Sequence, residues 1–147
     1  MPDSAATGTY MGFDYGARRL GVAVGESVTG SARPLTTLDC TDGEPDWHAV
    51  ANLVGEWQPQ ALVVGRPCHA DETASDSTEG AEQLAQALKT HTGLAVAMID
   101  ERLSSHEASE RLRERGYTSG RTADRRALDA VAAEVILESW FASRANL

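Results

Sequence analysis

Apolar residues follow two different patterns along the chain, and these patterns predict where strands and helices lie. Short, mostly apolar runs typical of strands occur at about 9–14, 20–26, 32–38, 61–65 and 94–99. Apolar residues at helical spacing predict helices over about 45–57, 76–91, 104–115 and 122–141. Matches to the capping box at Asp76-x-x-Glu79 and Ser104-x-x-Glu107 mark the starts of the second and third helices.

The order of these elements predicts an α/β fold. A short turn containing glycine separates the first two strands, which indicates a β-hairpin. The order is β-β-β-α-β-α-β-α, with the last helical stretch in two parts, and it favours a mixed five-stranded sheet with helices on both faces. Within the 147 residues we expect a disordered lead-in over 1–8, one domain over 9–142 and a frayed tail over 143–147.

Charge is distributed unevenly along an acidic chain. The formal net charge of −9 argues against simple nonspecific binding of nucleic acid. The segment 102–126, however, carries seven arginines against four acidic residues, a net charge of +3. Arginine binds phosphate through paired hydrogen bonds and stays charged, so this segment is predicted to contact phosphate.

Nothing in the chain predicts a membrane or a secreted protein. The longest apolar runs are far shorter than the roughly 20 residues of a membrane span. The N-terminus lacks the basic and apolar regions of a signal peptide. The two cysteines, Cys40 and Cys68, form no CxxC pair and indicate free thiols in a reducing compartment. We therefore expect a cytoplasmic protein without a membrane partner.

Asp14 is an acidic residue in an otherwise apolar strand, and two interpretations of it stay open. Aspartate is depleted in strands, and an ionised carboxylate buried there is costly without a cation or hydrogen-bond donors. Gly12 and Gly16 flank it and leave bare backbone where a ligand can come close. Asp14 is therefore a candidate metal ligand, or else an aspartate that caps its own turn.

Three further acidic residues extend this hypothesis. Asp100 and Glu101 end the last predicted strand, and Asp129 lies at the margin of the apolar stripe of the last helix. If the first and last strands run parallel, these carboxylates converge with Asp14 and need a divalent cation to be ionised together. Oxygen ligands favour Mg²⁺ or Mn²⁺, and two such ions about 4 Å apart can cleave a phosphodiester. The alternative is that 100 and 101 are helix-entry charges and 129 a solvated helix residue.

Four motifs, taken together and in order, resemble a known family. They are Gly12-Phe13-Asp14-Tyr15-Gly16 with Arg18 to Val24; Val63-Val64-Gly65-Arg66-Pro67; Asp100-Glu101-Arg102-Leu103-Ser104-Ser105 with Glu107-Ala108; and Leu128-Asp129-x-x-Ala132-Ala133-x-x-Ile136-Leu137. This set, spanning about 10–141, resembles the YqgF/RuvX family of proposed pre-16S rRNA nucleases, also called Holliday-junction resolvase-like proteins.

The resemblance implies a ribonuclease H-like fold and a metal-dependent endonuclease that matures the 5′ end of 16S rRNA in the bacterial cytoplasm. Its cofactor would be Mg²⁺ or Mn²⁺, and its partner pre-16S rRNA or a pre-ribosomal particle. The acidic set would be Asp14, Glu101 with the adjacent Asp100, and Asp129, with 14, 101 and 129 as metal ligands. Nucleic acid would be contacted by Arg18, Arg19, Arg102, Arg121, Arg125 and Arg126.

The chain departs from the family pattern in the loop 68–73, where Cys68 and His69 stand without an assigned role. A junction-DNA resolvase on the same fold is the first alternative, and it would need a dimer that presents two sites to branched DNA. A non-catalytic nucleic-acid-binding or ribosome-assembly factor is the second, favoured by the acidic net charge. The choice between monomer and homodimer stays open.

Overall fold

The computed structural model describes residues 8–16, 18–67, 76–101, 104–116 and 122–145, and the account below concerns these residues. The strands are β1 (Thr9–Tyr15), β2 (Arg19–Glu26), β3 (Ser31–Thr41), β4 (Glu44–Pro45), β5 (Ala61–Pro67) and β6 (Ala95–Glu101). The helices are α1 (Trp47–Trp57), α2 (Asp76–Thr92), α3 (Ser104–Glu114) and α4 (Thr122–Ala145). Residues 1–7 of the predicted lead-in and the loop containing Cys68 and His69 lie outside the described residues.

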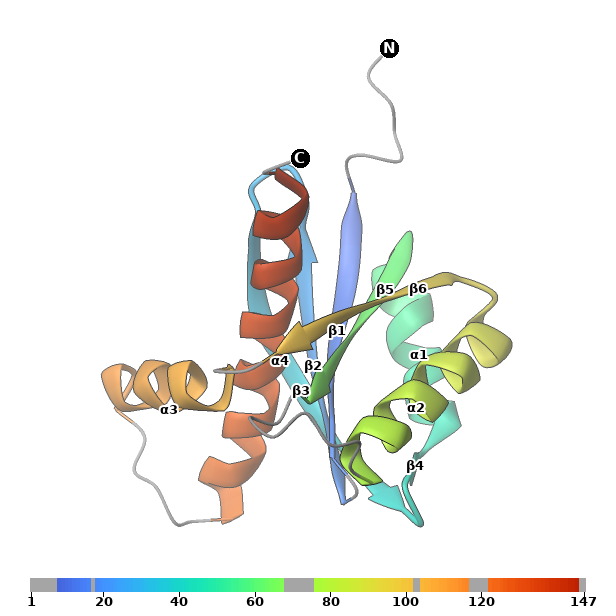
Figure 1. Cartoon of the computed structure of the whole chain (residues 1–147), viewed down its shortest axis with the longest axis horizontal. Helices are drawn as coiled ribbons and strands as arrows, with labels where there is room; N and C mark the ends of the chain where they lie inside the picture. Colours follow the sequence, from blue (N-terminus) through green and yellow to red (C-terminus); the bar gives the residue numbers. More distant parts are fainter. Residues whose placement is uncertain (1–7, 17, 68–75, 102–103, 117–121, 146–147) are drawn as a thin grey trace.

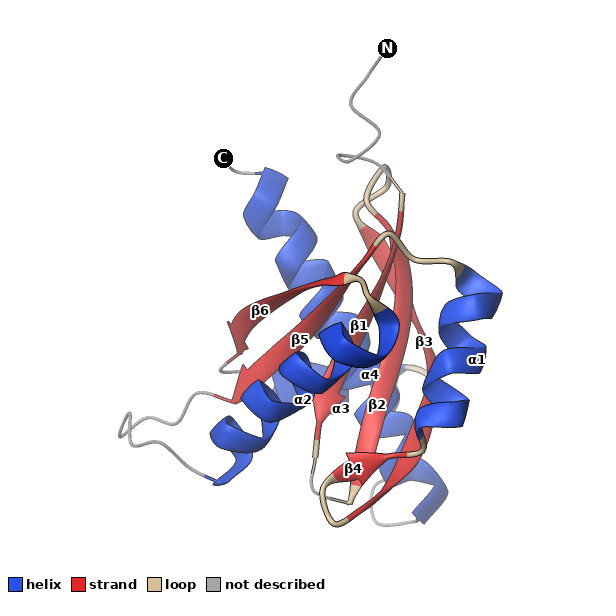
Figure 2. Cartoon of the chain, turned by 90° about the vertical axis from the view of Figure 1, so that its right-hand side faces the viewer, coloured by secondary structure: helices blue, strands red, loops and turns tan. Residues whose placement is uncertain are grey.

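The predicted mixed sheet with helices on both faces is confirmed. The strand order is β4-β3-β2-β1-β5-β6. β1 pairs antiparallel with β2 and parallel with β5, and β6 extends the parallel half. α1 and α2 cover one face of the sheet, while α4 covers the other and carries α3 on its flank (Figures 1 and 2). β1, β5 and β6 therefore end at the same rim of the sheet.

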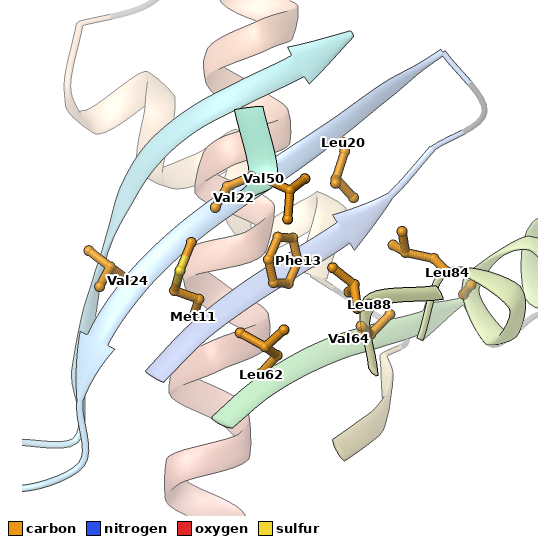
Figure 3. Packing of buried hydrophobic residues seen from close by; sticks show 11 residues of the cluster. Met11, Phe13, Leu20, Val22, Val24, Val50, Leu62, Val64, Leu84 and Leu88 are labelled. Carbon is orange, nitrogen blue, oxygen red and sulfur yellow. The ribbon is translucent and has the colours of Figure 1, made fainter. Parts of the chain in front are cut away.

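Alternation along the strands separates two cores. Met11 and Phe13 of β1 point toward α1 and α2, where they join the larger cluster of buried side chains (Figure 3). Tyr10 points to the opposite face and packs with Ile136, Leu137 and Phe141 of α4. We call these two sides of the sheet the α1/α2 face and the α4 face. Because the pleat alternates, Gly12 and Asp14 share the α4 face with Tyr10.

Two local features differ from the sequence-based expectation. The sheet has six strands instead of five, because β4 pairs with the end of β3. Asp42 and Gly43 connect them with φ of 54° and 80°, which suits a two-residue hairpin turn. α4 also continues through Ala145, past the predicted end near 141, and the Arg144 guanidinium lies 4.8 Å from the centroid of the Trp140 ring.

Within the described residues, no helix is long and apolar enough to cross a membrane.

Candidate active site

Asp14 lies near the C-terminal end of β1 in a row of residues that crosses the sheet. The strand registers place Thr37, Gly21, Asp14, Gly65 and Ile99 side by side on five neighbouring strands. All five occupy the α4 face, and the Asp14 carboxylate is flanked by a glycine on each adjacent strand. Asp14 therefore has a residue without a side chain beside it on each neighbouring strand, and it lies at the rim where β1, β5 and β6 end.

Two glycines let α4 lie directly on the sheet and bring Asp129 to this row. A Cβ added to Gly21 would overlap the backbone carbonyl of Asp129 and would lie 3.1 Å from the nitrogen of Ala130. A Cβ on Gly12 would lie 2.9 Å from Cβ of Leu137. The helix backbone thus rests on β2 at the residue paired with Asp14. Asp14 and Asp129, far apart in the sequence, therefore lie on the same face of the sheet, each next to Gly21.

The carboxylate of Asp129 is held by an arginine. Nε of Arg19 donates a hydrogen bond of 2.5 Å to Oδ2 of Asp129, and their side chains are 32% and 21% exposed. Arg19 lies two residues before Gly21 and therefore on the same face of β2. The guanidinium offsets part of the negative charge that gathers beside Asp14. In this structure Arg19, predicted to contact phosphate, binds a site carboxylate.

Asp100 and Glu101 occupy different sides of β6. Oδ1 of Asp100 accepts hydrogen bonds from Nε and Nη2 of Arg66, at 2.7 and 2.6 Å, on the α1/α2 face. The hydrogen bond and charge of Asp100 raise the pKa of Arg66 above its ordinary value. Glu101 is the last residue of β6, in register with Pro67, and its side chain lies outside the described part. The structure thus does not bring Asp100 together with Asp14.

The position of Glu101 is consistent with the acidic set. Ile99 packs in the cluster on the α4 face, and residues two apart in a strand belong to the same side. Position 101 therefore belongs to the side of the sheet that carries Asp14. β1 and β6 are two strand spacings apart, roughly 10 Å. Among the side chains that are described, no three His, Cys, Asp or Glu residues form a metal-binding group.

Arg126 is engaged within the protein. Its Nη1 contacts Oδ1 of Asp39 at 2.5 Å, and its Nη2 donates to the carbonyl oxygen of Thr37 at 2.6 Å. The hydroxyl of Thr37 donates in return to the carbonyl oxygen of Arg126. These bonds fasten the beginning of α4 to β3. Arg18 and Arg125 are exposed, and both lie near the rim: Arg18 follows β1, and Arg125 precedes Asp129 by one helical turn.

A second group of arginines holds α3 against α4. Arg115 binds both carboxylate oxygens of Glu134 at 3.1 Å, and Arg111 contacts Glu134 and Glu138 at 3.2 and 2.9 Å. The side chain of Glu134 is only 5% exposed, and its hydrogen bonds raise the pKa of Arg115. Glu134 stands in the apolar stretch of α4, and no motif in the sequence marks it as the partner of these arginines. Part of the arginine-rich segment is therefore structural, while Arg102 and Arg121 lie outside the described residues.

The donor set at the rim suits a hard divalent cation. Asp14 and Asp129 offer oxygen atoms only, and the third predicted ligand at position 101 is also a carboxylate. Such ligands are typical of Mg²⁺ and Mn²⁺ sites and atypical of zinc sites. The glycines at 21 and 65 leave the adjacent backbone uncovered by side chains, so a phosphate could approach the carboxylates closely.

Solved structures define the class to which this fold belongs. RuvC from Thermus thermophilus, in complex with a Holliday junction substrate, aligns with a TM-score of 0.56 and 17% identity, over 95% of this chain and 96% of that one. The fowlpox virus Holliday junction resolvase aligns with a TM-score of 0.55 and 12% identity, over 92% and 99%. At these identities the likeness concerns the fold, which is a RuvC-like ribonuclease H fold.

Sequence comparisons identify the family. The RuvX family profile, described as Holliday junction resolvase, matches residues 8–143. A protein from Nitrosococcus oceani is 42% identical over 137 residues, covering 93% of this chain and 88% of its own length. Another from Azotobacter vinelandii is 46% identical over 134 residues, covering 91% and 93%. Both bear the name "Putative pre-16S rRNA nuclease". This chain belongs to the RuvX family.

Proposed function

We propose that this protein is an endonuclease that uses Mg²⁺ or Mn²⁺ to cleave phosphodiester bonds, with the 5′ end of pre-16S rRNA as its substrate. The observation that carries the proposal is that Asp14 and Asp129 lie on one face of the sheet, both next to Gly21, with glycines on the two strands that neighbour Asp14. The names of the curated relatives support the choice of substrate. A pre-rRNA substrate would place the activity in the cytoplasm.

Each described residue at the rim has a part in this proposal. Asp14 and Asp129, with Glu101, would hold the metal, and Arg19 keeps the Asp129 carboxylate oriented along the seam between α4 and β2. When bound, divalent ions supply an activated water and stabilise the leaving oxygen. Arg18 and Arg125, both exposed near the rim, would bind phosphates on either side of the cleaved bond.

Replacing Asp14 by asparagine tests the proposal. Loss of a group that hydrogen-bonds to a metal ligand costs about 10–100-fold, so loss of a direct ligand should lower cleavage by at least about 100-fold. The substrate is a 16S rRNA precursor fragment, incubated with Mn²⁺, with Mg²⁺ or with EDTA. Glu56→Gln is the matched control, because Glu56 is an exposed acid on α1, across the sheet from the rim.

The expected result is metal-dependent cleavage by the wild type and the control, and none by Asp14→Asn with an unchanged melting temperature. Wild-type activity in Asp14→Asn would refute the assignment. A wild type that neither cleaves nor binds a divalent ion in calorimetry would favour a non-catalytic binding factor instead.

Junction resolution is a second candidate function, supported by the family description. It requires two sites acting on two strands and hence a homodimer. Competition between a four-way DNA junction and the rRNA precursor, combined with the mass of the protein in solution, separates the two functions. A monomer that prefers the precursor would exclude the resolvase.

A further inference from the structure

We propose that Arg66 and Asp100 are positioning residues that clamp the ends of β5 and β6, so that Glu101 stays at the rim, and that Asp100 itself binds no metal. This proposal rests on the proposed function for its catalytic consequences. Its structural basis, the clamp, is a contact between described side chains.

The direction of Asp100 excludes it from a site shared with Asp14. Its carboxylate meets Arg66, and Arg66 in turn contacts Glu82 of α2 at 3.3 Å, all on the α1/α2 face. Asp14 belongs to the α4 face, because Gly12, two residues earlier, packs against Leu137. Metal–oxygen bonds to Mg²⁺ are about 2.1 Å long, so carboxylates on opposite faces of a sheet cannot hold one ion.

The clamp lies at the last residue pairs between β5 and β6, next to a proline. β6 pairs with β5 alone among the described strands, and its last pair is Pro67 with Glu101. Proline has no N–H group to donate to the ladder. The preceding pair is Arg66 with Asp100, directly opposite each other. Two charge-assisted hydrogen bonds between their side chains stand next to the missing backbone donor and tie the end of β6 to β5.

The clamp is expected to affect geometry more than global stability. The side chains of Arg66 and Asp100 are 37% and 54% exposed, and exposed ion pairs contribute little to the stability of a fold. Catalysis is more sensitive, because a shift of about 1 Å in a catalytic group can cost about 100-fold in rate. Loss of the clamp should therefore lower kcat without changing the melting temperature. KM for the RNA should also stay constant, since neither residue is placed against it.

The test compares Arg66→Met, Asp100→Asn and the exchanged pair Arg66→Asp/Asp100→Arg, with Glu56→Gln on α1 as control, an exposed acid for which the described residues show no contact with Arg66 or Asp100. The first readout is amide hydrogen exchange of residues 98–101 in the metal-free protein. Exchange there should become faster in both single variants and return toward the wild-type rate in the exchanged pair. The control should leave it unchanged. Unchanged exchange in Arg66→Met would overturn the clamp whether or not the protein is a nuclease.

The second readout is calorimetry with Mn²⁺ alone, together with kcat. Both single variants should weaken Mn²⁺ binding about 10-fold, as expected for groups that orient a ligand, and the exchanged pair should regain most of it. If Asp100→Asn abolishes binding as Asp14→Asn does, while Arg66→Met and the control bind normally, Asp100 is a ligand and the proposal is wrong. If the proposed function itself is wrong, the wild-type protein will neither bind Mn²⁺ nor cleave the RNA, and this outcome is distinct from the result for the clamp.

Discussion

Gly21→Ala is the substitution that tests most directly whether α4 rests on the sheet. The added Cβ would overlap the carbonyl group of Asp129 and would stand 3.1 Å from the nitrogen of Ala130. Both obstacles are backbone atoms, so no side chain can rotate away to make room. Either α4 lifts from β2 or β2 bends, and in both cases Asp129 moves relative to Asp14.

The magnitude follows from the cost of overpacking. Forcing an extra carbon into a packed interior costs about 1–3 kcal/mol. At about 2–4 °C per kcal/mol for a chain of this size, the melting temperature should fall by about 2–12 °C. Cleavage of the rRNA precursor should fall further than stability predicts, by about 100-fold if Asp129 shifts by about 1 Å. Thermal unfolding by circular dichroism and the cleavage assay measure the two effects.

Two other glycines provide graded controls. Gly12→Ala would place its Cβ 2.9 Å from Cβ of Leu137 and 3.1 Å from the carbonyl oxygen of Ala133, so its cost should be smaller than that of Gly21→Ala. Gly55 lies in α1 with nothing within 4 Å of an added Cβ, and alanine there should stabilise by about 0.5–1 kcal/mol. A melting temperature of Gly21→Ala equal to that of the wild type, or higher than that of Gly12→Ala, would contradict the close contact between α4 and β2.

Further predictions concern parts of the molecule away from the rim. Glu134→Ala should lower the free energy of unfolding, measured in urea, by about 1–3 kcal/mol, because Arg115, which is 42% exposed, loses its buried partner. Glu107→Ala removes an exposed partner of Arg111 and should lower it by less than about 0.5 kcal/mol. Equal effects would contradict the importance of the buried carboxylate. Burial, and then the charge of the adjacent aspartate, raise the pKa of the Cys40 thiol. In a Cys68→Ser background, Cys40 should therefore react with iodoacetamide at pH 8 more slowly than a small free thiol. Stability should fall as pH rises through this raised pKa, since the unfolded chain ionises first.

The arginine-rich segment shows where charge counting fails. A net charge of +3 over 102–126 indicated phosphate contacts. In the folded protein Arg115 binds Glu134, 19 residues away, and Arg126 binds Asp39, 87 residues away. Their partners come from other elements of the fold, so part of the positive charge of the segment forms salt bridges that hold α3 and β3 against α4. Of the arginines predicted in this segment to contact nucleic acid, the exposed Arg125 remains a candidate, and Arg102 and Arg121 stay predictions.

The acidic pair at the end of β6 shows a different limit. Adjacent residues of a strand point to opposite faces, so Asp100 and Glu101 could never both join Asp14. The pattern alone does not say which of the two faces α4. The choice is made by the packing of Ile99 in the core of the α4 face and by the hydrogen bond between Arg66 and Asp100 on the α1/α2 face.

The sequence by itself determined the order of strands and helices, because the periods of hydrophobic residues differ between the two. It also determined the family, because four motifs of that family occur in the same order along most of the chain. Only the tertiary structure decided which charges meet. Asp129 comes to the α4 face beside the strand position paired with Asp14 because Gly21 lets α4 touch β2, and that contact joins residues more than a hundred positions apart. The local sequence pattern does not predict such contacts, since the pairing of side chains from different elements depends on strand register and on close approach in three dimensions.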